Sequence, residues 1–459
     1  MTNCKSLLLF LSLFCLLLRL PAQQPGELPW LKPEPAKKQA LLAAIESRYK
    51  KDVEELSGKH KKQLAEIFKE RYEIVKTAIE GEETITDSRI NAYLSSLVAE
   101  IFKANPSLPA SEIRVLFSND VVVNACSMGE GTILFNTGLF HRLKSESQAV
   151  FTICHELAHY LLDHGNNSIR SYVNTVYSDS FQKELKSIQQ SEFKQNQQLI
   201  SLAVNFTFRN RRHSRQHEAA ADSMAVELMK NTGYNLQGAL ECLAILDSSA
   251  KMKYDSPLRL QERFNFSGQP FRKRWIDSDV MRFTSEDETA ADSILADSLK
   301  THPDCSTRIE RLKPFIKARQ QPGARDFKVS EATFKQLVQQ FDYELLEHLF
   351  KKKEVSKCLF LTLQMLNTHP SDPYLHTMTG RCLNEIYRRQ KAHELNRFVD
   401  LPADTYNAEY NQLLHLIQNL RLTEIAALSF YYLQQQEAGC AAYKPFGSVF
   451  EEAKKHFTN

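Results

Sequence analysis

A predicted helix that carries two histidines and a glutamate on a largely apolar surface constrains this 459-residue chain more than any other feature. His155, Glu156 and His159 form a His-Glu-x-x-His motif. Residues four apart share one face of an α-helix, so both imidazoles can reach one metal ion, and Glu156 lies about 100° around the same helix. Apolar residues recur at helical spacing around the motif, namely Ala149, Val150, Ile153, Leu157, Ala158, Leu161 and Leu162. The pattern predicts a buried helix of the zinc-hydrolase type.

The alternative interpretation of this helix is a structural one, in which the two histidines and the glutamate are only hydrogen-bonded to their neighbours. Burying three polar groups together is costly unless each of them is paired. We therefore favour the metal site over the structural helix.

A catalytic zinc site usually needs a third protein ligand. The metzincin extension of the motif would place Gly at 162 and His at 165, but the chain has Leu162 and Gly165 there. His164 is one residue out of register, and we expect it to be a surface histidine at the helix end.

A second predicted helix offers a better third ligand. Glu218 and Asp222 are four residues apart, so they share one face of this helix. We expect Glu218 to bind the metal and Asp222 to accept the free ring N–H of a ligating histidine. The alternative is an acidic first turn of an ordinary helix.

These motifs, taken in order, resemble a known family of zinc metallopeptidases. It includes the CAAX prenyl endopeptidase, the HtpX heat-shock protease and the periplasmic β-barrel assembly-enhancing protease. The resemblance covers about 86–315, and it also draws on 124–139, on Ser214-Arg215 before the glutamate helix, and on Thr301-His302-Pro303 followed by Arg308. Family members often have an aromatic residue and Pro-Gly-Gly after Asn-Ala, whereas this chain has Cys126 to Gly131.

The resemblance implies an α+β fold, with a gluzincin-type peptidase domain that holds a small sheet. It also implies endopeptidase activity on proteins with one Zn²⁺ per chain, bound by His155, His159 and Glu218, and with Glu156 as the general base. The tetrahedral oxyanion needs a donor besides the metal, and Arg308 and His302 are the candidates.

His302 carries a further hypothesis, because Pro303 biases it towards an extended loop backbone. A loop histidine near the metal could occupy the fourth ligand position and act as a switch that blocks the enzyme. The alternative is a helix-capping or surface histidine.

The segment Thr132, Ile133, Leu134 and Phe135 is β-prone and lies between Gly131 and Gly138. We expect it to form an exposed edge strand that binds an extended substrate through its backbone. The alternative is a strand paired inside the sheet.

The N-terminus predicts export from the cytoplasm. Leu7 to Leu18 is almost entirely apolar, follows Lys5 and ends at Arg19, which is too short for a membrane span of about 20 residues. We interpret residues 1–23 as a signal peptide of an extracytoplasmic, most simply periplasmic, protein; the alternative is a retained anchor. The net charge of +3 gives no indication of nucleic acid binding.

Composition and periodicity divide the rest of the chain. Residues 24–85 are predicted to form a long charged helix, and 86–318 the zinc peptidase domain. Within that domain, 250–300 is turn-rich, either a mobile loop that gates the cleft or simply irregular. Residues 324–459 are predicted to form an all-α lobe with one or two degenerate tetratricopeptide-like units, a surface suited to a protein partner. A plain helical lobe is the alternative.

Together these features indicate a secreted zinc-dependent endopeptidase that hydrolyses peptide bonds in proteins, with a role in the quality control of envelope proteins by resemblance. One rival is a non-catalytic, chaperone-like scaffold whose zinc site is structural or shut. The second is a membrane-anchored prenyl-protein processor, which would need membrane spans that the sequence does not show beyond its N-terminus.

Overall fold

The computed structural model describes residues 31–81, 84–109, 112–190, 195–248, 256–277 and 305–458, without the side chains of 195–213. The predicted signal peptide and His302 lie outside the described residues. The chain divides into two compact units. We call the one within 30–253 and 283–345 the sheet unit, and the one within 254–282 and 346–459 the helical unit.

The sheet unit contains a three-stranded sheet of strand order β1-β3-β2 within the described residues. Strand β1 (Arg114–Ser118) runs parallel to β3 (Thr132–Asn136), and β2 (Ala125–Ser127) runs antiparallel to β3. All five residues of β3 are buried, and neighbouring strands pair with both of its edges. β2 and β1 are therefore the outer strands.

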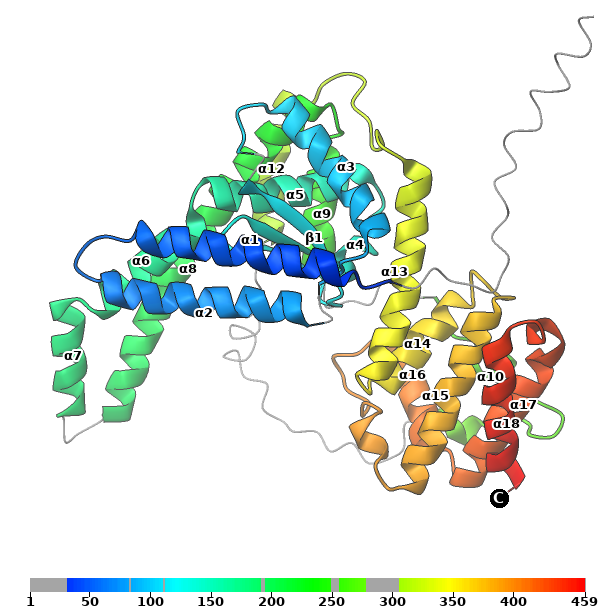
Figure 1. Cartoon of the computed structure of the whole chain (residues 1–459). Helices are drawn as coiled ribbons and strands as arrows, with labels where there is room; N and C mark the ends of the chain where they lie inside the picture. The colour runs from blue at the N-terminus through cyan, green and yellow to red at the C-terminus, as the bar shows by residue number, and fades with distance from the viewer. Residues whose placement is uncertain are drawn as a thin grey trace, which may run out of the picture. The chain divides into compact units, whose positions relative to one another are not determined.

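Helix α5 (Glu146–Leu161) is the centre of this unit, and its residues from Glu146 to Ala158 are all buried. Ser145 caps its N-terminus by accepting a hydrogen bond from the N–H of Gln148. Helices that pack against α5 are α3 (Ser88–Ala104), α6 (His164–Val176), α8 (Gln195–Thr232) and α9 (Gln237–Asp247) (Figure 1). The unit also contains α4 (Thr137–Phe140), α7 (Asp179–Gln189) and α12 (Cys305–Arg319). The fold is α+β, as predicted.

The N-terminal helix differs from the prediction, because it is broken into a helical hairpin. Helix α1 (Pro35–Glu54) packs against α2 (Lys61–Glu80), and Figure 1 shows the two side by side. Gly58, at a φ of 96°, lies in the turn between them, a backbone conformation that favours glycine. The hairpin belongs to the same compact unit as the sheet, so the predicted boundary near residue 85 does not separate two units.

The helical unit is all-α, as predicted for the C-terminal lobe. Helix α13 (Glu331–Lys351) begins in the sheet unit, and its residues from 346 onward belong to the helical unit. The unit continues with α14 (Val355–Met365), α15 (Pro373–Lys391), η3 (Leu395–Arg397), α16 (Ala408–Asn419), α17 (Leu422–Cys440) and α18 (Lys444–Thr458). The predicted helix–turn–helix lies at α14 and α15, where Asp372 caps α15 through the N–H groups of Tyr374 and Leu375.

Residues 256–277 were expected to be an irregular loop or a gate, but they form part of the helical unit. This segment contains α10 (Leu260–Arg263) and η2 (Lys273–Trp275). Leu258, Phe264 and Trp275 in it are fully buried. The side chain of Asn419 donates hydrogen bonds to three backbone carbonyls of the segment, so specific contacts hold it against the helices.

Two further findings concern membranes and thiols. Within the described part of the chain, none of the helices combines the length and apolar character that a membrane crossing requires. Cys154 is fully buried beside the motif. Cys358 and Cys382 are free thiols.

Candidate functional site

The metal-binding motif lies in the last two turns of α5. His155 and Glu156 are buried, and His159 is partly exposed at 16% of its side chain. Helix α8 packs along α5 and brings Glu218 and Asp222 to the same place, 4% and 2% exposed. The five residues predicted from two distant motifs therefore meet in one cluster, of which only His159 is partly exposed.

The three predicted ligands converge on one point. Nε2 of His155 lies 3.1 Å from Nε2 of His159, and the carboxylate of Glu218 lies 3.4 Å from the first nitrogen and 3.3 Å from the second. Ligands held at zinc's usual distances in a tetrahedron are about 3.4 Å from one another. His155, His159 and Glu218 thus fit one divalent ion with the geometry and donor types of a zinc site.

Asp222 lies against the ring of His155. Its Oδ1 lies 3.1 Å from Nδ1 of His155, which fixes the ring so that Nε2 faces the other ligands. Burial by itself would raise the pKa of Asp222, but its hydrogen bonds to Arg308 and His155 lower this pKa to about 2. Asp222 is therefore a carboxylate at neutral pH and can only accept.

Arg308 contacts the carboxylates of both Asp222 and Glu218. Its Nε and Nη2 donate to the two oxygens of Asp222 at 2.8 and 2.7 Å, and its Nη1 lies 2.9 Å from the Glu218 carboxylate. Burial opposes its charge, but these carboxylates outweigh burial and raise the pKa of Arg308. Its three nitrogens all lie beside carboxylates, and its Nη2 is also 3.5 Å from Nε2 of His155. These contacts place Arg308 to orient the ligands through Asp222 and Glu218, and the role as oxyanion donor stays a prediction.

His164 is a site residue that the sequence interpretation missed. It was expected on the surface, but it is 7% exposed, and its Nδ1 lies 3.0 Å from Nδ1 of His159. Asp163 adopts a left-handed backbone with a φ of 53°, so the chain turns sharply. Helix α6 therefore begins at His164, next to His159. The signal was the Asp163-His164-Gly165 turn directly after the motif helix.

The protonation of His164 follows from its surroundings. Burial and the neighbouring rings of His159 and His217 lower its pKa to about 4, and the His217 ring stacks on it with centroids 4.1 Å apart. His164 is therefore neutral at pH 7. If Nε2 of His159 binds a metal, Nδ1 of His159 holds the ring proton and donates a hydrogen bond to Nδ1 of His164.

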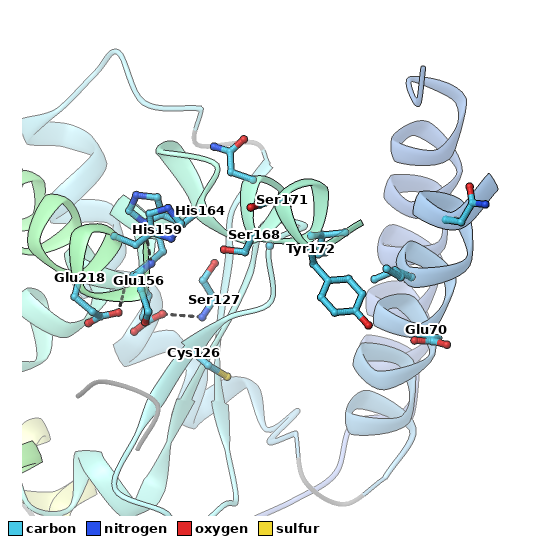
Figure 2. A pocket seen from close by; sticks show the side chains of 18 of the residues that line it. Glu70, Cys126, Ser127, Glu156, His159, His164, Ser168, Ser171, Tyr172 and Glu218 are labelled. Atoms are coloured by element: carbon cyan, nitrogen blue, oxygen red, sulfur yellow. Dashed lines mark hydrogen bonds and ion pairs between the residues drawn. The ribbon is translucent and has the colours of Figure 1, made fainter. Parts of the chain in front are cut away.

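Glu156 lies beside the three ligands and faces a cleft. The backbone N–H of Ser127 in β2 donates to its Oε2 at 2.7 Å, a charge-assisted bond that fixes the carboxylate. Figure 2 shows this bond and the side chain between Ser127 and the ligands. The position suits a general base that acts on a water at the metal.

The cleft has a volume of about 1040 Å³. Its floor contains Glu156, His159 and Glu218, and its walls come from β2, α2, α6 and the part of α8 around Ser214 and His217 (Figure 2). A cleft of this size with convergent polar groups at one end is a typical ligand site. The metal cluster is therefore accessible to a substrate.

The predicted substrate strand is not at an edge. Thr132, Ile133, Leu134 and Phe135 belong to β3, which is the central strand and has β1 and β2 on its two sides. Its backbone groups are already used in both ladders, so the prediction of an exposed edge there is wrong. The outer strand beside the catalytic cluster is β2.

Comparison with known proteins agrees with this site. A search of the curated proteins finds no match to this chain. The family model described as Peptidase family M48 matches residues 88–316, a stretch that contains His155, Glu156, His159, Glu218 and Asp222. The chain therefore belongs to peptidase family M48, a family of metallopeptidases.

Proposed function

We propose that this protein is a zinc-dependent endopeptidase that hydrolyses internal peptide bonds of proteins. The observation that carries the proposal is the convergence of His155, His159 and Glu218 at mutual distances of 3.1–3.4 Å, with the Glu156 carboxylate beside them. Membership of family M48 supports peptide hydrolysis. The cleft of about 1040 Å³ that contains this cluster supports a substrate as large as a peptide.

The chemistry follows from the positions of the side chains. Zinc, when bound, supplies a Lewis acid that polarises the scissile carbonyl and lowers the pKa of water. Glu156 accepts the proton of the attacking water as the C–O bond forms, and delivers that proton to the amine nitrogen as the C–N bond breaks. Ser127 holds the carboxylate in place for both transfers. Asp222 and His164 keep the two histidine rings oriented.

We propose that the substrate backbone lies along β2. Cys126 pairs directly with Leu134 of β3 in the antiparallel register, and Met128 N donates to Thr132 O. In an antiparallel ladder the alternate residues direct their main-chain groups to the other side, so Ala125 and Ser127 present theirs towards the cleft. The N–H of Ser127 already binds Glu156, which places an added strand beside the general base.

The cellular setting is also a proposal. The apolar run from Leu7 to Leu18 supports export to the periplasm, where removal of misassembled envelope proteins would be the work of such an enzyme. The helical unit, with its tetratricopeptide-like turn between α14 and α15, would bind a protein partner or present substrates. Cell fractionation with an antibody to the chain tests the location, and recovery in the cytoplasm would contradict it.

Substitution of Glu156 by glutamine tests the reaction. The change keeps the size and the hydrogen bond from Ser127 but removes the base, so purified Glu156→Gln should retain about one zinc per chain and lose casein cleavage by roughly a thousandfold or more. Glu130→Gln, a substitution of another buried carboxylate of the sheet unit, is the control and should cleave casein. A Glu156→Gln protein that cleaves normally would support the rival scaffold interpretation instead.

A further inference from the structure

One arm of the cleft lies between α2 and α6, and each helix lines it with residues of one face. On α2 the lining residues are Gln63, Glu66, Ile67 and Glu70, and on α6 they include Gly165, Ser168, Ile169 and Tyr172. Both sets follow the spacing of a single helix face. The two helices pack against each other within the sheet unit. Their lining residues belong to the same cleft as Glu156, His159 and Glu218, so the arm is continuous with the metal cluster (Figure 2).

The base of this arm is apolar and its side is aromatic. Ile67 and Ile169 pack on the apolar cluster between the helices and also line the arm. Tyr172 and Tyr177 keep 44% and 39% of their surface exposed there. Figure 2 shows Tyr172 extending from α6 towards α2. Exposed rings in a cleft offer a surface on which an alkyl stem or a planar cation can pack.

The opposite wall is negatively charged. Glu66 and Glu70 are exposed on α2, four residues apart, and no ion pair joins either of them to another described residue. The described residues that line the cleft include four glutamates and no lysine or arginine. Like charges at this spacing repel each other, and a cation placed between them would remove that repulsion.

We propose that this arm is the specificity subsite of the enzyme and that it takes a substrate side chain with a long apolar stem and a cationic head. Arginine is preferred over lysine, because its guanidinium also stacks on Tyr172 while it pairs with Glu66 and Glu70. Lysine is preferred over an uncharged chain of the same length, and glutamate is excluded. This inference rests on the proposed peptidase function and adds the substrate class.

The test uses the full-length, zinc-loaded protein and quenched fluorescent peptides. Each position of one cleaved sequence is replaced in turn by arginine, norleucine or glutamate. At one position arginine should raise kcat/KM about fivefold over norleucine, an effect of the size of exposed ion pairs and cation–π contacts, and glutamate should lower it. The difference should lie mainly in KM.

Variants then assign the effect to the arm. The double variant Glu66→Gln with Glu70→Gln should reduce the ratio of arginine to norleucine below about twofold. Glu73→Gln, on the same helix but outside the lining, should keep the wild-type ratio. Tyr172→Ala should weaken arginine and norleucine peptides together, because both stems lose the ring.

Two results would overturn the inference: no position at which arginine exceeds norleucine, or a preference that persists in the double variant. Either result with efficient cleavage leaves the proposed function intact. A wild-type protein that cleaves no peptide would count against the proposed function instead. In that case fluorescence anisotropy measures the affinity of the same peptides for Glu156→Gln and tests the inference without cleavage. We expect the arginine peptide to bind more tightly than the norleucine peptide.

Discussion

Arg308 donates hydrogen bonds to both carboxylate oxygens of Asp222, from its Nε to Oδ2 at 2.8 Å and from its Nη2 to Oδ1 at 2.7 Å. Asp222 in turn meets the ring of the metal ligand His155 at 3.1 Å. A buried cation thus orients a ligand through a carboxylate, and the same cation balances the charge of Glu218. The metal cluster is therefore held from three helices, α5, α8 and α12.

The first prediction concerns Arg308. Lysine cannot form the two-pronged contact with Asp222, so Arg308→Lys should lower the affinity for zinc by about 10- to 100-fold, as losses around metal ligands usually do. Competition with a zinc-binding dye measures this affinity. Arg311→Lys is the matched control, because Arg311 lies on the same helix and contacts Ser223 instead; it should bind zinc like the wild type.

The same substitution distinguishes the two roles considered for Arg308. A positioning residue affects metal binding, whereas an oxyanion donor affects kcat at saturating zinc. Normal zinc affinity with a strongly reduced kcat in Arg308→Lys would support the oxyanion role and contradict the positioning role.

The second prediction concerns His164, which faces the outer nitrogen of His159 at 3.0 Å. His164→Ala removes the acceptor for that ring, so zinc affinity should fall by about tenfold or more. His164→Asn retains an acceptor oxygen and should recover part of the loss. Dye competition on the three proteins checks the order, and equal affinity of His164→Ala and the wild type would show that His164 does not position the ligand.

The third prediction concerns the buried Glu146 at the start of α5. Its carboxylate accepts hydrogen bonds from the hydroxyls of Tyr93 and Tyr234 and from the backbone N–H groups of 328–330. The amide of Glu146→Gln would turn an N–H₂ towards some of these donors, so the substitution should reduce the free energy of unfolding by about 2–4 kcal/mol. Urea unfolding measures this, and Glu100→Gln, a partly exposed carboxylate paired with Lys328, should cost less than about 1 kcal/mol.

Glu146 also makes stability depend on pH. Burial raises its pKa, but the hydrogen bonds from Lys328, Tyr93, Ser330 and Val329 outweigh burial and hold this pKa below its ordinary value. The unfolded chain therefore binds the proton more readily, so Glu146 contributes stability above about pH 4.5 that is lost as the pH falls. Below this pH the free energy of unfolding of the wild type should fall more steeply than that of Glu146→Gln. Parallel pH profiles would contradict this account.

The fourth prediction concerns a close backbone approach at Gly138. A Cβ atom there would lie 2.0 Å from the carbonyl oxygen of Val121, which is backbone and cannot move aside easily. Gly138→Ala should therefore destabilise the protein by about 3 kcal/mol. Gly447→Ala, where a Cβ meets nothing within 4 Å, should be neutral or stabilising by up to about 1 kcal/mol. Thermal unfolding compares the two, and equal melting temperatures for both variants would show that the loop at 121 yields.

The grouping of His155, His159 and Glu218 could be predicted from the sequence because the chemistry of a metal site fixes the spacing of its ligands. His155, Glu156 and His159 lie on one helix, and the spacing of Glu218 and Asp222 fixes which two carboxylates share a helix face. Only one tertiary contact is then needed to complete the cluster, namely the packing of α8 against α5 through their apolar faces.

Other features depended on the tertiary arrangement and could not be predicted in this way. The strand Thr132–Asn136 has the composition of any buried or edge strand, and only the strand order shows that it is central. His164 depends on the left-handed turn at Asp163, and a one-residue difference in that turn would have pointed its ring elsewhere. Arg308 comes from a helix 86 residues beyond Asp222, so no local pattern reveals which of several charges it meets.

The central claim is that one zinc ion is bound by two histidines of α5 and a glutamate of α8. Anomalous diffraction at the zinc edge, on crystals of the zinc-loaded wild-type protein, tests it most directly. We predict one strong peak, about 2.1 Å from Nε2 of His155, from Nε2 of His159 and from the carboxylate of Glu218. A peak that lacks Glu218 among its ligands, or zinc bound only at His164 and His217, would contradict the account.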